Sequence, residues 1–121
     1  MNSPDAAERP DEATTLFVYG SLRDPVRRHD IIGRRVDTLP ATLDSYEPGH
    51  ARFFYIRKRP GTSTAGLLLL NLTPQDFEKL DHYEEVPRLY TREKIDVFVR
   101  GGHRVRCWVY LPTILTLAGE K

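Results

Sequence analysis

The sequence predicts an α+β fold, a mixed β-sheet or β-barrel of about six strands with two or more flanking helices. Three observations lead to this prediction. Short apolar and β-branched segments recur between turn residues, as is typical of strands. Two segments have a capping residue followed by proline, which is typical of helix starts. Helices and strands do not alternate regularly, so a sheet built from βαβ units is not favoured.

The length and composition fit one domain. A chain of 121 residues can bury about two-thirds of its unfolded surface around one core. We expect a single domain over residues 16–121, preceded by a disordered acidic tail over residues 1–15, which are rich in Asp, Glu, Ala and Pro. The longest apolar run, residues 65–70, is too short to cross a bilayer, so we expect no membrane partner.

Charge and cysteine content argue against several classes of partner. The net charge is +1, and no aromatic pattern accompanies the basic residues, so we expect no nucleic-acid partner. The single cysteine, Cys107, has no evident activating partner and is interpreted as a core residue. A lone cysteine fits a reducing compartment, and we expect the cytoplasm. The histidines lack the spacing of a ligand pair, so no metal site is expected.

The first strand and the first helix are close together in the sequence. Residues 16–19, Leu-Phe-Val-Tyr, suit a strand that is buried on both faces, and Gly20 ends it. A turn must follow. Asp24 can cap a helix that begins with proline and that Gly33 can end, so we expect a helix over Pro25–Ile32.

The middle of the chain contains three predicted strands. Residues 41–46 and 51–57 have strand composition, and residues 47–50, Glu-Pro-Gly-His, separate them. Pro60 and Gly61 mark another turn before an apolar strand over residues 66–72.

A second helix follows these strands. Thr73 is a suitable cap, Pro74 suits the first helical position, and the acidic Asp76 falls in the first turn. The pattern predicts a helix that continues to about Glu84.

A hairpin completes the predicted fold. Residues 94–99 and 104–110 both have strand composition, and Gly101 and Gly102 lie between them. Because two glycines accept positive φ angles, we expect a two-residue turn at this place.

The turn after the first strand is a candidate binding site. Gly20 lets a ligand approach the backbone without meeting a side chain, and the following amides of Ser21 and Leu22 are then free to bind an anion. From Tyr19 to Leu22 alone, however, a turn without a ligand is the favoured interpretation.

The second helix carries an acid on its apolar face. Phe77, Leu80 and Glu84 are spaced at i, i+3 and i+7, so this face points inward. Partial burial at a helix C-terminus raises the pKa of a carboxyl above about 4.3, which makes Glu84 a candidate proton acceptor. The alternative is that Glu84 only pairs with Arg88 or Arg92, and spacing alone favours it.

Other arrangements have less support. A triad of Ser21, His82 and Asp81 lacks the Gly-x-Ser-x-Gly setting of a hydrolase, and adjacent residues on a helix point in different directions. Tyr90 and Tyr110 are interpreted as half-buried packing residues whose hydroxyls can reach a pocket.

Taken together, four segments resemble the γ-glutamylcyclotransferase-like family, and in particular its small bacterial and plant members. They are residues 17–23 (Phe-Val-Tyr-Gly-Ser-Leu-Arg), 65–67 (Ala-Gly-Leu), 80–84 (Leu-Asp-His-Tyr-Glu) and 90–92 (Tyr-Thr-Arg). Their order and spacing over residues 16–111 make the resemblance specific. It implies a mixed β-barrel with flanking helices.

The resemblance also implies an activity. Family members cyclise a γ-glutamyl amine or peptide to 5-oxoproline and release the amine. In this reaction the substrate's own α-amino group attacks its γ-carbonyl. The resemblance places the catalytic glutamate on Glu84. The residues that it implies for substrate binding are Tyr19, Gly20, Ser21, Leu22 and Tyr90. The partner is a small molecule, the reaction needs no metal or organic cofactor, and a monomer or a homodimer is expected.

Two departures leave the substrate open. Glu85, which we expect to face solvent, stands where the family often has glycine, and residues 51–59 lack the family's Gly-Tyr-Pro-like stretch. The alternative function is a non-catalytic module that binds a small carboxylate on the same fold. Glu84 favours the enzyme, because a buried acid gives no advantage to a protein that binds anions.

Overall fold

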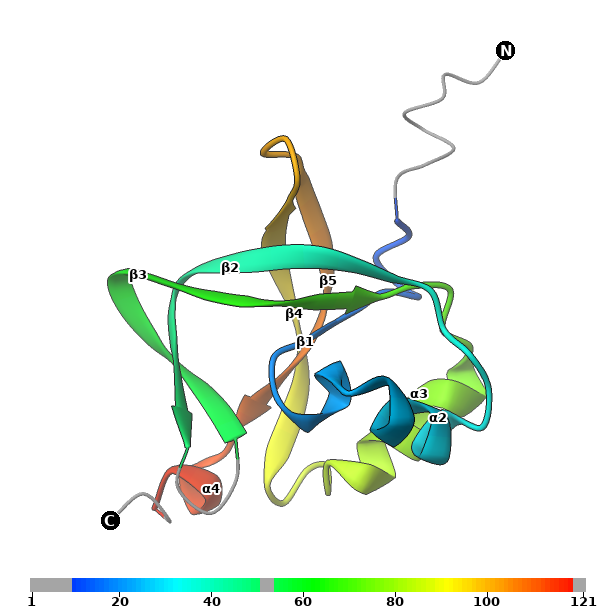
Figure 1. Cartoon of the computed structure of the whole chain (residues 1–121). Helices are drawn as coiled ribbons and strands as arrows, with labels where there is room; N and C mark the ends of the chain where they lie inside the picture. The colour runs from blue at the N-terminus through cyan, green and yellow to red at the C-terminus, as the bar shows by residue number, and fades with distance from the viewer. Residues whose placement is uncertain (1–9, 51–53, 119–121) are drawn as a thin grey trace.

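A computed structural model describes residues 10–50 and 54–118 (Figure 1). The elements in chain order are β1 (Leu16–Val18), the 3₁₀ helix η1 (Ser21–Arg23), α2 (Pro25–Ile32), β2 (Thr38–His50), β3 (Phe54–Leu69), α3 (Pro74–Tyr83), β4 (Tyr90–Val99), β5 (Arg104–Pro112) and α4 (Ile114–Ala118). The strands form a closed barrel in the order β1-β3-β2-β4-β5. The β1–β5 pair is parallel and the pairs β1–β3, β2–β3, β2–β4 and β4–β5 are antiparallel, so the expected mixed barrel is confirmed.

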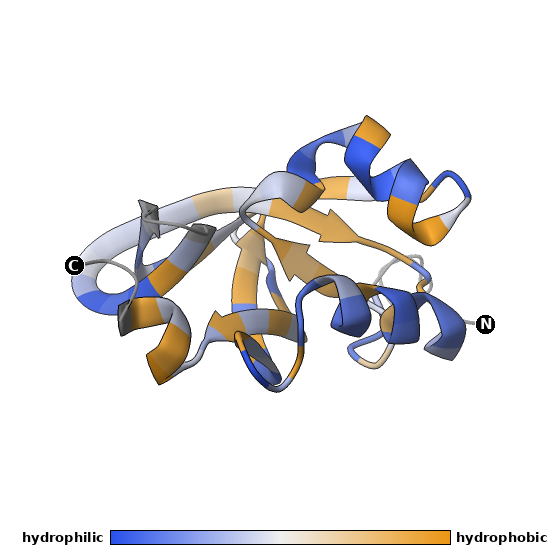
Figure 2. Cartoon of the chain, turned by 90° about the horizontal axis from the view of Figure 1, so that it is seen from below, coloured by the Kyte–Doolittle hydropathy of each residue, from blue (hydrophilic) through white to orange (hydrophobic). Residues whose placement is uncertain are grey.

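The short strand β1 lies at the centre of the fold. Its three residues are buried, as expected, and it pairs with β3 on one side and β5 on the other. Leu16 and Val18 belong to a core cluster that includes Ile32 of α2 and Leu80 of α3. Phe17 belongs to a second cluster formed by barrel residues. Figure 2 shows the central strands largely in hydrophobic colours and both colours on the helices.

The helix α2 has the bounds that its capping residues predict. The Asp24 side chain accepts a hydrogen bond from the Val26 amide at 3.0 Å, and Pro25 occupies the first turn. Gly33 ends the helix in the left-handed conformation, with a φ of 87°. Local capping chemistry is therefore sufficient to predict this element.

The helix α3 also begins as predicted. The Thr73 hydroxyl accepts from the Asp76 amide at 3.1 Å, and the Asp76 carboxylate accepts from the Thr73 amide at 2.9 Å. The last helical residue is Tyr83, and Glu84 is the C-terminal capping residue. Figure 1 shows α2 and α3 side by side at one end of the barrel.

The prediction of three strands in the middle of the chain was wrong, because two long strands occupy this region. β2 continues through residues 47–50, and β3 runs through Gly61. Asp44 pairs with Ser63 and Tyr46 with Lys58, so residues 59–62 bulge out opposite a single residue of β2. The turn signal at positions 60–61 therefore marks an irregularity, since the strand on either side of it pairs with β2. Of the predicted strand 51–57, residues 51–53 lie outside the described residues.

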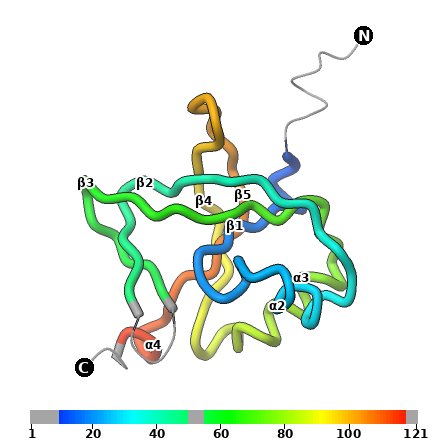
Figure 3. The backbone as a smooth tube through the Cα atoms, viewed as in Figure 1, coloured from blue at the N-terminus to red at the C-terminus, as the bar shows by residue number. Residues whose placement is uncertain are grey.

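The outer halves of β2 and β3 form a two-stranded arm. We define the arm as residues 46–50 and 54–58, which pair with each other. The contacts of β2 with β4 occur at Ala41 and Thr42, before the arm begins. Figure 3 shows the arm curving away from the barrel, and Figures 1 and 2 both show its far end near α4.

The predicted hairpin is formed by β4 and β5. Gly101 and Gly102 have positive φ angles of 89° and 79°, as expected. The Val99 amide, however, donates to the His103 carbonyl at 2.9 Å. The loop therefore includes Arg100 as well as the two glycines, so the prediction of a two-residue turn was wrong.

Order begins earlier than the expected boundary at residue 16. Thr15 is buried, and its carbonyl accepts from the Trp108 amide at 2.9 Å. The Thr14 carbonyl accepts from Leu72 at 2.9 Å, and Glu12 pairs with Lys94. Some of residues 11–15 of the expected tail thus contact the barrel, while residues 1–9 lie outside the described residues and the domain boundary stays a prediction.

Candidate active site

The C-terminal end of α3 carries the candidate catalytic residue. The Glu84 amide donates to the Leu80 carbonyl at 2.9 Å, which completes the last helical turn. The next two amides then close the helix, from Glu85 to His82 at 3.1 Å and from Val86 to Asp81 at 3.0 Å. This is the Schellman pattern of a helix end. Its left-handed residue is Glu85, with a φ of 55°.

Glu84 lies on the inward face of α3, as its spacing predicts. Phe77 and Leu80 on the same face are buried, and Glu84 itself is half-buried, whereas Glu85 is exposed. Burial raises the pKa of Glu84 from 4.5 to about 7, because a partly desolvated carboxylate is less stable than a solvated one. Near neutral pH the group can therefore both accept and return a proton.

Three tyrosines lie near this carboxyl group. Burial is the main cause that raises the pKa of Tyr19, Tyr90 and Tyr110, and the negative charge of Glu84 contributes to each shift. A contribution of this kind requires proximity. The tyrosines come from the end of β1, from β4 and from β5, so separate strands of the barrel meet at Glu84.

The sequence left open that Glu84 only forms an ion pair with Arg88 or Arg92. Among the described residues, neither ion pair is present. Arg88 pairs with Glu85 instead. Arg92 pairs with Asp81, from Nε to Oδ1, at 2.9 Å. Both candidate partners are therefore engaged elsewhere, and the Glu84 carboxylate keeps no ion pair among the described residues.

The turn after β1 is held against the end of α3. The Ser21 hydroxyl and the Tyr83 hydroxyl share a hydrogen bond of 2.8 Å, and Arg27 donates to the same Tyr83 oxygen at 3.1 Å. Tyr83 immediately precedes Glu84. The structure therefore brings the predicted binding turn and the predicted catalytic residue together, although they are far apart in the sequence.

The backbone of the turn has an unusual conformation at Gly20. Its φ of −116° and ψ of −134° lie outside the helical, extended and left-handed regions, which glycine tolerates best. Gly20 also has no side chain to keep a ligand away from the backbone. The Leu22 side chain is buried in the core, so this residue can contribute only its backbone to a site. The first amides of a helix, here η1, have no intrahelical acceptor.

A hydrogen-bonded chain that sequence reasoning missed lies beside Glu84. The Tyr19 hydroxyl donates to the Tyr110 carbonyl at 2.6 Å, and the Tyr110 hydroxyl donates to Asp81 Oδ1 at 2.6 Å. Arg92 donates to both oxygens of Asp81. The sequence shows an acid, Asp81, three residues before Glu84, but this spacing does not reveal the hydrogen-bond partners of Asp81.

We refer to the residues gathered here as the Glu84 corner: Tyr19, Gly20, Ser21, Leu22, Tyr83, Glu84, Tyr90 and Tyr110. The set includes every site residue that the sequence predicts, and their roles stay predictions. The Ser21, His82 and Asp81 triad is not formed, because Ser21 bonds Tyr83, Asp81 bonds Arg92 and Tyr110, and His82 is exposed. Cys107 is buried, and burial raises the pKa of its thiol to about 12, which fits a core residue.

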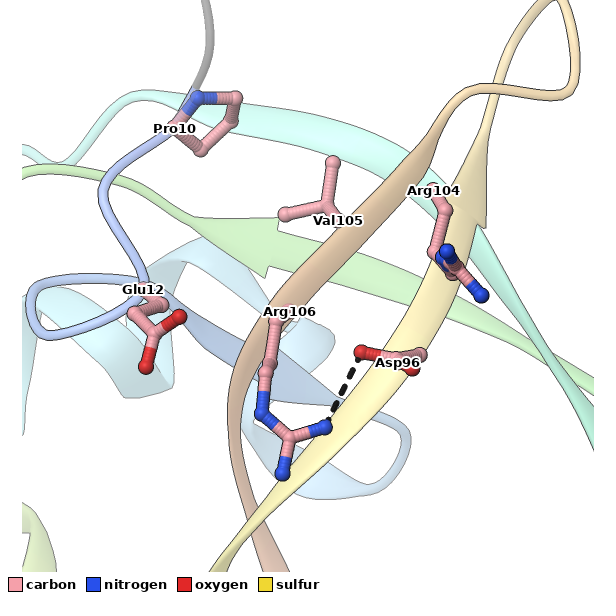
Figure 4. A pocket seen from close by; sticks show the side chains of 6 residues that line it. All are labelled: Pro10, Glu12, Asp96, Arg104, Val105 and Arg106. Carbon is pink, nitrogen blue, oxygen red and sulfur yellow. Dashed lines mark hydrogen bonds and ion pairs between the residues drawn. The ribbon is translucent and has the colours of Figure 1, made fainter.

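One further feature lies away from this corner. A hollow of about 430 Å³ is lined by Pro10, Glu12, Asp96, Arg104, Val105 and Arg106 (Figure 4).

Within the described ranges, there is no group of three or more His, Cys, Asp or Glu side chains that could hold a metal ion. None of the described helices is long and apolar enough to span a membrane.

The chain is similar to known proteins over most of its length. Residues 16–119 match the family described as Gamma-glutamyl cyclotransferase, AIG2-like. A protein of Methanocaldococcus jannaschii, named as a gamma-glutamylcyclotransferase with a provisional second name as an RNase, is 27% identical over 103 residues. The match covers 79% of this chain and 45% of that protein, so the chain spans less than half of this relative's length.

Solved structures show the same fold. A protein of Arabidopsis thaliana, determined in solution, has a TM-score of 0.75 at 22% identity, and the match covers 84% of this chain and 69% of that one. A structure named Gamma-glutamyl cyclotransferase has a TM-score of 0.74 at 20% identity, with coverages of 83% and 66%. A mouse AIG2-like protein has a TM-score of 0.60 at 22% identity, with coverages of 83% and 77%. With the family match over residues 16–119, these findings show that the chain belongs to the gamma-glutamyl cyclotransferase, AIG2-like family.

Proposed function

We propose that this protein is a γ-glutamylcyclotransferase that converts a γ-glutamyl amine or a short γ-glutamyl peptide to 5-oxoproline and releases the amine. Glu84 is the general base and acid of the reaction. One observation carries the proposal: a half-buried carboxyl with a pKa of about 7 and no ion pair among the described residues follows Tyr83, whose hydroxyl is hydrogen-bonded to Ser21 of the turn after β1.

The reaction moves protons from the attacking nitrogen to the departing one. The substrate's α-amino nitrogen attacks its γ-carbonyl carbon, and the new C–N bond closes the ring while the C–N bond to the amine breaks. Because the α-amino group is protonated near neutral pH, it loses one proton before it attacks and a second one as the ring closes. Glu84 accepts these protons in turn and returns them to the departing nitrogen, so the amine leaves as an ammonium ion. A carboxyl with a pKa of about 7 suits both directions of transfer.

The protein's other task is to select a folded-back substrate. Both reacting groups belong to one molecule, so holding it in the reactive conformer supplies much of the rate. In the proposal, the backbone from Gly20 to Leu22 holds the γ-glutamyl part, and Tyr19 and Tyr90 line the same place. The hydrogen bond between Ser21 and Tyr83 ties this turn to the residue that precedes Glu84.

The proposal is tested by measuring 5-oxoproline release from a panel of γ-glutamyl amines and peptides, with the wild-type chain and with Glu84→Gln. Glutamine keeps the shape of the side chain and cannot accept the proton. We expect turnover to fall at least about a hundredfold while the variant stays folded. Glu85→Gln is the matched control, because Glu85 is adjacent and exposed, and its turnover is expected to stay near wild type.

Each outcome has a distinct meaning. Undiminished turnover in Glu84→Gln would show that Glu84 is not the base. Binding without turnover by the wild-type chain across the whole panel would favour the alternative function, a non-catalytic module for small carboxylates. We also propose a cytoplasmic location, which a fractionation experiment can test.

A further inference from the structure

The Asp81 carboxylate stands at the centre of a hydrogen-bonded chain that crosses the fold. Arg92 of β4 donates to it twice, from Nε at 2.9 Å and from Nη2 at 3.1 Å. Tyr110 of β5 donates its hydroxyl to the same group at 2.6 Å. The Tyr110 carbonyl in turn accepts from the Tyr19 hydroxyl at 2.6 Å. One carboxylate therefore connects α3, β4 and β5. The backbone of Tyr110 in β5 then contacts Tyr19, the residue before Gly20.

The arginine of this chain is held by more than its ion pair. The guanidinium carbon of Arg92 lies 4.5 Å from the ring centroid of Phe77 and 4.4 Å from that of Trp108. A planar guanidinium stacked on aromatic rings is oriented before it binds its carboxylate, which a lysine ammonium is not. The side chains of Arg92 and Asp81 are 24% and 28% exposed, so the pair is also partly shielded from salt.

We propose that the Asp81–Arg92 pair is a positioning device for the Glu84 corner. It holds the Tyr110 side chain, whose backbone carbonyl accepts from the Tyr19 hydroxyl, and its two opposite charges cancel each other beside Glu84. The inference rests on the proposed function of Glu84 as the general base.

The charge argument follows from the groups that face Glu84. Tyr19, Tyr90 and Tyr110 face it from the strands, and on α3 itself Asp81 lies three residues before it, which makes the two side chains neighbours. An unpaired Asp81 would disfavour a second negative charge there. In the proposal Arg92 cancels that effect. Burial is the cause that raises the pKa of Glu84. The charges of Asp81 and Glu84 help to raise the pKa of Tyr110 and that of Arg92 lowers it, so all three groups lie near the Tyr110 hydroxyl.

Two substitutions separate this role from a purely structural one. Asp81→Asn keeps an acceptor for Tyr110 and leaves the Arg92 charge uncompensated, so the acid limb of the kcat/KM profile is expected to move to lower pH by about half a unit or more. Arg92→Met keeps an apolar stem over the rings and leaves the Asp81 charge uncompensated. The acid limb is then expected to move by a similar amount to higher pH, and the double variant is expected to return towards wild type.

Asp96→Asn is the matched control. Asp96 of β4 forms an ion pair of 3.2 Å with Arg106 of β5, beside the hollow that Figure 4 shows. This pair is outside the Glu84 corner, so its loss is expected to leave the pH profile unchanged. If Arg92→Met does not fold, Arg92→Lys replaces it. Lysine keeps the charge and loses the planar fork, so kcat is expected to fall severalfold while the acid limb stays in place.

A second measurement separates this inference from the proposed function. The ¹³C signal of the Glu84 carboxyl can be titrated by NMR in each full-length variant without any turnover. If the wild-type chain releases no 5-oxoproline, the proposed function fails, and the titration still decides the role of the pair. Shifts of opposite sign in Asp81→Asn and Arg92→Met support the inference. Equal shifts, or none, in folded variants overturn it.

Discussion

Replacing Glu84 by glutamine is expected to stabilise the protein above neutral pH, although it removes the proposed base. The pKa of Glu84 is raised by burial from 4.5 to about 7. Because each pKa unit corresponds to about 1.4 kcal/mol, ionising this group in the folded chain costs about 3 kcal/mol. Glutamine has a similar shape and does not ionise, so Glu84→Gln avoids this cost.

The sign of the effect depends on which state ionises first. Below about pH 4.5, Glu84 is protonated in both the folded and the unfolded chain, so it imposes no penalty. Between pH 4.5 and about 7, the unfolded chain releases the proton while the folded chain keeps it, and stability falls as the pH rises. The penalty is complete above pH 7. The difference between the variant and the wild-type chain is therefore expected to grow through this window and then level off.

Urea unfolding at a series of pH values between about 4 and 8.5 measures this difference. Trp108 is the only tryptophan of the chain and packs near Phe77 and Arg92, so its fluorescence reports on the core. Glu85→Gln is the control and is expected to show no such growth. A stability difference that does not change with pH, or a variant less stable than wild type at pH 8, would refute the burial argument.

Two further substitutions test the backbone around the Glu84 corner. Glu85→Gly places glycine at the left-handed end of α3 and is expected to raise the free energy of unfolding by about 1 kcal/mol with 5-oxoproline release unchanged, and an equal or lower value in urea unfolding would contradict this. Gly66→Ala places a Cβ 2.3 Å from the Val18 carbonyl oxygen and 2.7 Å from the Phe17 ring, so a loss of about 3 kcal/mol is expected. An unchanged Tm would show that β1 can move aside.

Elements that depend on neighbouring residues were predictable from the sequence. The bounds of α2 follow from Asp24 and Gly33, and the start of α3 follows from Thr73 and Asp76. Each of these depends on hydrogen bonds within a few residues, which the sequence makes explicit. The inward direction of Glu84 was predictable for the same reason, since helical spacing decides it.

Features that depend on distant contacts were not predictable. The turn signal at positions 60–61 does not reveal that both sides pair with the same strand, because that pairing is decided by the register of β2. In the same way, Arg88 and Arg92 are equally plausible partners for Glu84 by spacing. In the structure Arg92 pairs with Asp81 instead of Glu84. Its position on β4 places its guanidinium over the rings of Phe77 and Trp108, within reach of Asp81.

The arm has a consequence for how the family can diversify. Residues 46–50 and 54–58 pair with each other, whereas β2 pairs with β4 earlier, at Ala41 and Thr42. A pair of residues added to or removed from the arm therefore leaves the barrel register intact, and the entropic cost of a longer connection grows only slowly with its length. The arm can therefore change in length while the barrel that carries the Glu84 corner stays unchanged. Differences in arm length between relatives are thus expected to exceed differences around β1 and α3.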